Sequence, residues 1–176
     1  MNFDRTILPR IMKAVVWRTC NVLERETGVT VTETATELRD VNVLALHEAT
    51  VIVGIGGAVS LLIAFSFKRR LLERMCDRYT NGIDIADYGR EFYLKETAAE
   101  IVNTIIGLCM GDFHDGNELI TLSPPAIIEE ARSIRRPRNA VFSCIALKSG
   151  SSGLEINFVG PRHLFDERLN VVARGA

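Results

Sequence analysis

Hydrophobic positions that recur every three or four residues predict two long amphipathic helices. The first spans Ile7–Glu26, with Trp17 as an expected core anchor and Gly28 as the residue that ends it. The second spans Glu91–Gly111. Its apolar positions follow the i, i+3, i+4, i+7 spacing of a helix with one buried face: Leu94, Ala98, Ile101, Val102, Ile105, Leu108 and Cys109. A shorter helical pattern covers Phe67–Tyr79.

Other stretches have the composition of strands. Val29–Leu38 is rich in threonine and β-branched residues, which is typical of a strand with one solvated face. Val51–Phe67 contains no charge, and Gly56 and Gly57 separate its apolar runs, which predicts a hairpin inside a covered sheet. Arg39–Ala49 is expected to be loop or strand end. The strands predicted in the second half are Glu118–Leu122, Asn139–Leu147 and Leu154–Val159, followed by a short helix at Arg162–Leu169.

The order of these elements indicates the fold class. Helix, three strands and helix occur twice along the chain, so we predict pseudo-duplicated halves within a single domain, residues 1–176. The fold is expected to be α+β, with a largely antiparallel sheet of about six strands and helices packed on it.

A membrane-spanning segment is the alternative for Val51–Phe67. Its length lies at the lower edge of a membrane helix, and Lys68–Arg70 follows it as a basic flank. Glycines near its middle, and the lack of Trp or Tyr at either end, favour the hairpin instead. We therefore expect a protein that does not associate with membranes.

Composition limits the classes of partner and indicates the cellular compartment. The net charge is −1, which gives no reason to expect nucleic acid or an anionic membrane as a partner. The four cysteines are widely spaced and form no Cys-x-x-Cys motif, so free thiols are expected. The first ten residues carry charge and have no apolar signal core. These features predict a cytoplasmic protein.

The second long helix also carries a polar stripe. Glu96, Glu100 and Asn103 project side by side because residues three and four apart share a helix face, and Gly107 continues the stripe without a side chain. Such residues are usually solvent cover, but Asn is a poor helix former. This helix could present a carboxylate and a carboxamide, one turn apart, to a docking partner.

The Glu100-x-x-Asn103 pair lies on a helix that runs into IIGLCMGDF and precedes a strand and Ser123-Pro124-Pro125. This arrangement resembles the CheX-like chemotaxis phosphatases of the CheC/CheX family, and the order of elements agrees over nearly the whole chain. Glu167-x-x-Asn170 has the same spacing without that setting. The first helix contains no Glu-x-x-Asn, so one active site per chain is expected.

The resemblance implies a function and its residues. The expected reaction is dephosphorylation of the aspartyl phosphate of a phosphorylated CheY-type response regulator. Asn103 would orient the attacking water and Glu100 would pair with the regulator's lysine, while Glu96, Gly107 and Pro125 would contact the partner. No metal or cofactor of its own is implied, because Mg²⁺ is expected on the receiver. The resemblance also implies a homodimer.

Other interpretations stay open or are disfavoured. The same face could belong to a non-catalytic module that binds a receiver or a flagellar-switch protein. His114-Asp115 lacks further ligands nearby, so a metal site there is disfavoured. Gly54-x-Gly56-Gly57 lacks the third glycine and the helix of a dinucleotide site. A basic group around Pro137 could steer an acidic partner: Arg132, Arg135, Arg136 and Arg138.

Overall fold

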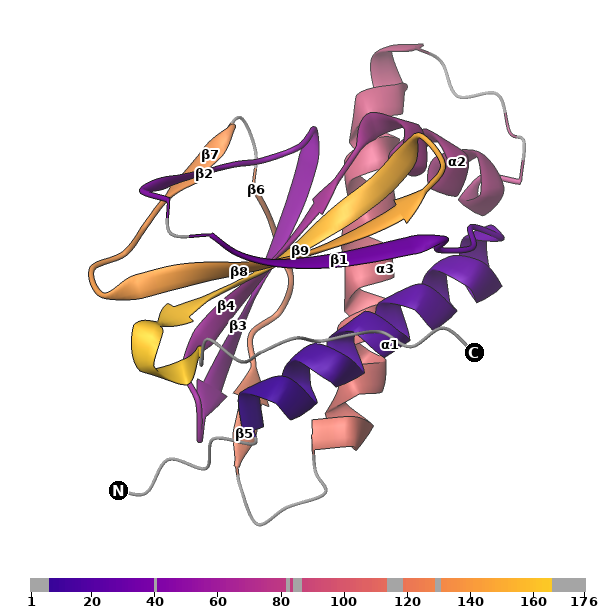
Figure 1. The fold of residues 1–176 in the computed structure, drawn as a ribbon. Helices are drawn as coiled ribbons and strands as arrows, with labels where there is room; N and C mark the ends of the chain where they lie inside the picture. Colours follow the sequence, from indigo (N-terminus) through magenta and orange to yellow (C-terminus); the bar gives the residue numbers. More distant parts are fainter. Residues whose placement is uncertain are drawn as a thin grey trace.

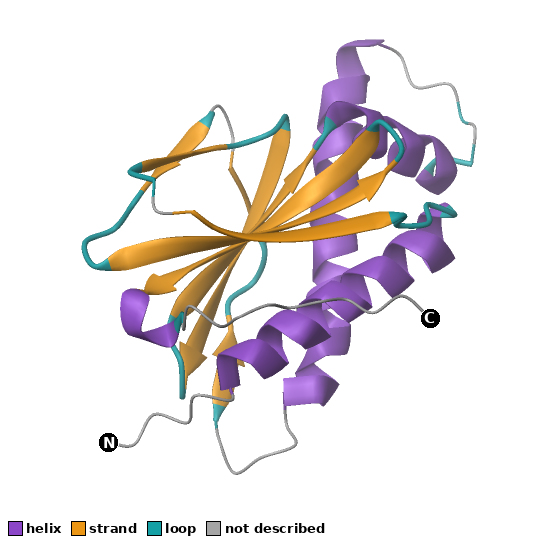
Figure 2. Cartoon of the chain, viewed as in Figure 1, coloured by secondary structure: helices purple, strands orange, loops and turns teal. Residues whose placement is uncertain are grey.

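The computed structural model describes residues 7–39, 41–81, 83, 87–113, 119–128 and 131–165, and it contains a sheet with helices on one side (Figures 1 and 2). The helices are α1 (Ile7–Thr27), α2 (Arg69–Tyr79), α3 (Asp87–Phe113) and the 3₁₀ helix η1 (Arg162–Leu164). The strands are β1 (Glu33–Arg39), β2 (Val43–Ala45), β3 (Ala49–Gly57), β4 (Leu61–Phe67), β5 (Ile120–Leu122), β6 (Ala126–Ile128), β7 (Ser133–Arg135), β8 (Ala140–Ser149) and β9 (Ser152–Pro161).

The main sheet has the strand order β1-β8-β9-β4-β3-β5, and β6 also pairs with β3. Every strand pair in the described residues is antiparallel. The α-helices lie on one side of this sheet, whereas the small β2–β7 sheet lies on the other side (Figure 1). The predicted α+β class, with a largely antiparallel sheet and helices packed on it, is confirmed.

The two halves of the chain exchange strands. The hairpins β3–β4 and β8–β9 meet through β4 and β9 at the centre of the sheet. The strand β1 leaves its own half to pair with β8, while β5 and β6 pair with β3 of the first half. Each half therefore completes the other's part of the sheet.

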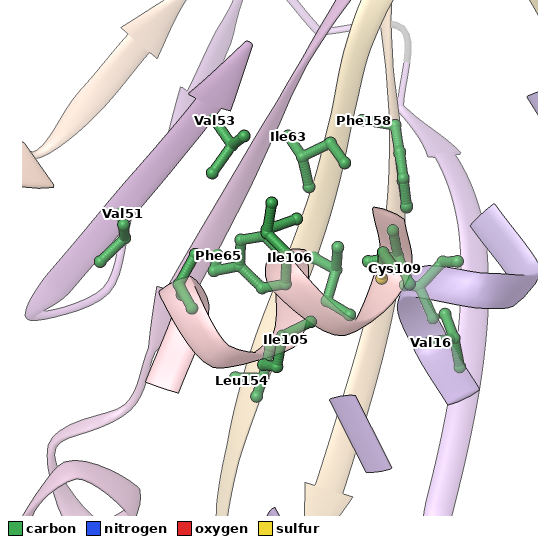
Figure 3. Close-up of a cluster of buried hydrophobic side chains, with 14 of the residues drawn as sticks. Val16, Val51, Val53, Ile63, Phe65, Ile105, Ile106, Cys109, Leu154 and Phe158 are labelled. Carbon is green, nitrogen blue, oxygen red and sulfur yellow. The ribbon is translucent and has the colours of Figure 1, made fainter. Parts of the chain in front are cut away.

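The apolar face of α3 anchors the helix on this sheet. Six of its seven predicted core residues are buried, and Ile106 joins them. Figure 3 shows Ile105, Ile106 and Cys109 of α3 between Val16 of α1 and side chains of the sheet, among them Phe65. Each fully buried aliphatic or aromatic side chain stabilises the fold by about 1.5–3 kcal/mol. The opposite face of α3 is thereby held rigidly outward.

The Val51–Phe67 segment forms the predicted hairpin, as β3 and β4. Gly57 has φ +98°, and an added Cβ there would lie 2.0 Å from the Leu119 carbonyl oxygen. Only glycine fits this position without strain. In the part of the chain that the structure describes, no helix combines the length and hydrophobicity needed to cross a membrane.

Some sequence predictions were wrong. Trp17 is 53% exposed because it follows the inward pair Val15 and Val16 and so projects away from the buried face of α1. Leu108 is also partly exposed. The helix α3 continues beyond Gly111, because burial of Phe113 extends the core contact by another half turn. The Arg39–Ala49 stretch contains β2, which is too short to be recognised from sequence.

Candidate functional site

The polar stripe of α3 is exposed along its length. Glu96, Glu100, Asn103 and Gly107 all face solvent, while residues on the opposite side of the helix form the core. A Cβ built at Gly107 would meet no atom within 4 Å. Another molecule can therefore approach the α3 backbone closely at Gly107.

A hollow of about 460 Å³ lies over the first part of this stripe. Its lining combines residues from α3, from the end of α2 and from the β5–β6 connection: Tyr79, Thr80, Tyr93, Glu96, Thr97, Ala99, Glu100, Asn103 and Pro125. The structure thus brings together four of the five predicted site residues. Gly107 lies outside the lining, about one turn beyond Asn103.

The helix α2 forms one wall of the hollow and is tied to the start of α3. Arg90 Nη2 lies 3.0 Å from Asp77 Oδ1, and Arg69 pairs with Glu91. At the end of α2 the Thr80 N–H and hydroxyl both bond the Cys76 carbonyl at 2.9 Å, which closes the helix. These contacts hold α2 beside α3 (Figure 1), and Tyr79 and Thr80 line the hollow.

A bulge places Pro125 on the other side. Ser123–Pro125 faces only Val53 and Gly54 of β3, so this segment carries one residue more than the strand it runs along. Bulges re-aim side chains at the edges of sheets. Here the extra residue interrupts the pairing between β5 and β6, and Pro125 lines the hollow.

The hollow is acidic. Glu96 and Glu100 lie one turn apart, and no Lys, Arg or His is among the lining residues. Burial, together with the carboxylates of Glu26 and Glu100, raises the pKa of Tyr79. Like any tyrosine hydroxyl, that of Tyr79 is protonated at neutral pH and can donate a hydrogen bond. Like charges at i, i+4 are unfavourable within one helix, so a positively charged group docked there would be stabilised.

The site has few groups for covalent chemistry. No Cys or Ser lines the hollow. Burial raises the pKa of Cys109 and of Cys144 to about 12, so neither thiol is an activated nucleophile. Within the described ranges, no group of three or more His, Cys, Asp or Glu side chains could hold a metal ion. The Asn103 carboxamide can both donate and accept hydrogen bonds, which suits the positioning of a water.

Sequence reasoning missed part of this lining. Tyr93 and Thr97 lie seven and three residues before Glu100, so helical spacing alone would have placed them near it. Tyr79 and Thr80 gave no such signal, because they reach the stripe only through the packing of α2 on α3. His114, Asp115, Glu167 and Asn170 lie outside the described residues.

Comparison with known proteins gave structural matches. No protein-family model matches the chain, and no curated protein is significantly similar to it in sequence. The CheX chemotaxis protein of Desulfovibrio desulfuricans superposes with a TM-score of 0.69 at 21% identity, covering 84% of this chain and 97% of that one. A CheC-like superfamily protein from Shewanella sp. PV-4 gives 0.70 at 12% identity, with 85% and 96% covered.

A third match is a complex. CheX of Borrelia burgdorferi, solved with CheY, BeF₃ and Mg²⁺, gives a TM-score of 0.62 at 18% identity and covers 85% of this chain and 97% of that one. These identities are low, so the likeness concerns the fold. The chain therefore has the fold of the CheX and CheC-like chemotaxis proteins, as the order of its sequence elements predicted.

Proposed function

We propose that this protein hydrolyses the aspartyl phosphate of a CheY-type receiver protein. The observation that carries the proposal is the exposed pair Glu100 and Asn103, held in one hollow by a helix whose other face is fully buried. A protein of the same fold has been solved with CheY, BeF₃ and Mg²⁺, which supports a receiver as the partner.

The reaction needs little from the phosphatase itself. A water attacks the phosphorus in line, the bond from phosphorus to the aspartyl oxygen breaks, and its electron pair returns to the carboxylate. The released phosphate keeps the water oxygen and both of its protons. The Asn103 carbonyl oxygen accepts a hydrogen bond from that water and so fixes its direction of attack. Phosphoryl transfer depends mainly on such positioning and on charge stabilisation, and the receiver's Mg²⁺ would supply the latter.

Glu100 acts in the complex with the bound receiver. Its carboxylate lies one turn from Asn103 and would pair with the receiver's lysine, which sets how deeply Asn103 inserts. That pair would exist before and during reaction, so Glu100 contributes to binding. By fixing the insertion of Asn103 it also contributes to the rate. The acidic lining of the hollow favours the approach of such an ammonium group.

The test is the decay of phosphorylated receiver in the presence of Asn103→Ala. Loss of an exposed, poor helix former leaves the fold intact, while the rate at saturating receiver should fall by about a hundredfold. A folded Asn103→Ala protein that accelerates decay as the parent does would overturn the proposal. A parent that binds receivers without accelerating decay would instead be a binding module.

A further inference from the structure

Large aromatic side chains stand exposed around the hollow. Tyr79 is 39% exposed, Phe92 62% and Tyr93 44%, and we call these residues the aromatic rim. The Phe92 and Tyr93 rings meet edge to face, with centroids 5.8 Å apart and an interplanar angle of 82°. Phe92 lies one turn before Glu96, so the rim continues the line of the polar stripe.

The position of the rim determines what can cover it. Tyr79 and Tyr93 line the same hollow as Glu100 and Asn103. A standard interface covers about 800 Å² on each partner, which corresponds to a patch roughly 16 Å in radius. Tyr93 is ten residues before Asn103 on one helix, about 15 Å along its axis. A protein that brings a reacting group to Asn103 therefore also reaches the rim.

We propose that the aromatic rim is the docking contact for the receiver and sets the affinity of the complex. This inference rests on the proposed function. Tyrosines combine a large apolar surface with a hydrogen-bonding hydroxyl and are enriched among the residues that dominate binding energy. The contact exists before and during reaction, so it strengthens binding without changing the chemical step.

Charge disfavours a second copy of this chain as the occupant. In a two-fold symmetric contact the same surface faces itself, so Glu96 and Glu100 of one protomer would approach those of the other. Such an arrangement would bring carboxylates together with no lining cation to neutralise them. A receiver that offers a lysine to Glu100 relieves this charge instead.

The experiment compares two exposed aromatic residues. Tyr93→Ala changes the rim, and Trp17→Ala changes a similarly exposed ring on α1 that does not line the hollow. Affinity is measured by calorimetry with CheY-type receivers loaded with Mg²⁺ and beryllofluoride, and KM and kcat are measured with phosphorylated receiver. Tyr93→Ala should raise Kd and KM about tenfold, with the loss confined to those constants. Tyr93→Phe should retain most of the affinity, and Trp17→Ala should match the parent.

Two results would contradict the proposal that the aromatic rim is the docking contact. One is an unchanged Kd for Tyr93→Ala, and the other is an equal loss of affinity for Trp17→Ala. The proposed function fails separately. If the parent binds receivers with a Kd that depends on Tyr93 but never accelerates decay, the rim is supported as the docking contact and the proposed phosphatase activity is wrong. If the parent accelerates decay but Tyr93→Ala leaves Kd unchanged, only the proposal that the aromatic rim is the docking contact is wrong. A parent that binds no receiver would overturn both.

Discussion

The backbone N–H of Gly54 donates a 2.8 Å hydrogen bond to the Ser123 hydroxyl, and the Gly54 carbonyl accepts a 2.9 Å bond from the Ser123 N–H. The Ser123 hydroxyl in turn donates to the Pro124 carbonyl over 3.1 Å. These bonds hold the bulge that carries Pro125 to the hollow. The Ser123 side chain also packs closely on Gly54, where an added Cβ would lie 3.4 Å from the Ser123 Oγ.

We therefore expect Ser123→Ala to loosen the bulge. Stability should fall by only about 1 kcal/mol, because this exposed site lets water replace the lost bond. Receiver affinity should fall as well, since Pro125 loses its fixed position. Urea unfolding and receiver binding measure the two effects. Ser133→Ala, at an exposed serine of β7, is the matched control. Unchanged affinity in Ser123→Ala would show that the bulge does not shape the interface.

The glycines of α3 allow stability and docking to be separated. Gly107 and Gly111 are both exposed, and a Cβ at either would meet nothing within 4 Å. Replacing a helix glycine with alanine should add about 0.5–1 kcal/mol of stability. Gly107→Ala should nevertheless weaken receiver binding, because its methyl group stands on the stripe that the partner covers. Tm and KM should thus both rise, because stability is gained while affinity is lost.

Gly111→Ala provides the comparison for that experiment. It lies one turn further along α3 from the hollow, so its stability should rise with a smaller increase in KM than for Gly107→Ala. If Gly107→Ala binds receivers as tightly as Gly111→Ala does, then the bare backbone at Gly107 has no role in docking.

The acid stability of the fold should depend on Glu155. His47 and Arg39 hold the pKa of Glu155 at about 2, against the effect of burial, with Arg39 Nη1 3.1 Å and His47 Nε2 3.8 Å from its carboxylate oxygens. A lowered pKa stabilises the folded state above the ordinary value of 4.5, and this contribution is lost as pH falls from about 4.5 to 2.

Glu155→Gln is therefore expected to cost about 2 kcal/mol at pH 7 and to flatten the fall in stability over that acidic range. Urea unfolding at several pH values provides the measurement. Glu33→Gln on β1 removes a carboxylate that is mostly exposed and pairs with Lys148 at 3.4 Å, so it should change little. A variant at Glu155 with the parent's acid profile would contradict the ion-pair interpretation.

We also predict a homodimer. The strand β1 stands at one edge of the main sheet and pairs only with β8 among the described strands, so its outer backbone groups need solvent or another strand. Pairing between copies is a common way to cover such an edge. Light scattering at micromolar concentration should give twice the 19.6 kDa chain mass. A clean monomer mass would refute the prediction.

The sequence predicted those features that depend on one element at a time. Periodicity identified the buried face of α3, since burial recurs with the helical repeat. The Gly56-Gly57 pair indicated the β3–β4 hairpin, although both glycines end β3 and the turn follows at residues 58–60. Trp17 was misplaced because a hydrophobic side chain was assumed to face inward. In the structure its ring instead lies 4.3 Å from the Arg18 guanidinium, which Asp112 holds through two 2.7 Å bonds.

Features that depend on tertiary packing were not predictable in this way. The wall at Tyr79 exists only because α2 packs on α3, and nothing in the local sequence of α2 indicates that contact. The approach of Pro125 to the hollow depends on the register between β3 and its neighbours, which the bulge shifts by one residue. The short strands β2 and β7 are stabilised by pairing with each other and by Leu44 and Ile134 packing on the sheet.

The final prediction separates the two stripe residues from their duplicate spacing elsewhere in the chain. Glu100→Ala should raise KM, because the pair with the receiver's lysine exists before and during reaction, and should lower kcat, because Asn103 then loses the contact that sets its insertion. Asn103→Ala should lower kcat and leave KM nearly unchanged, since its carboxamide acts once the water is in place. Glu167→Ala and Asn170→Ala repeat the same changes at the same spacing, outside the described residues, and should leave both constants unaltered. Steady-state decay of phosphorylated receiver, with folding checked by circular dichroism, provides the comparison.

Equal losses at the two pairs would mean that spacing without the α3 setting is sufficient. A kcat that is insensitive to Asn103 would remove the water-positioning role, whatever Glu100 does to binding.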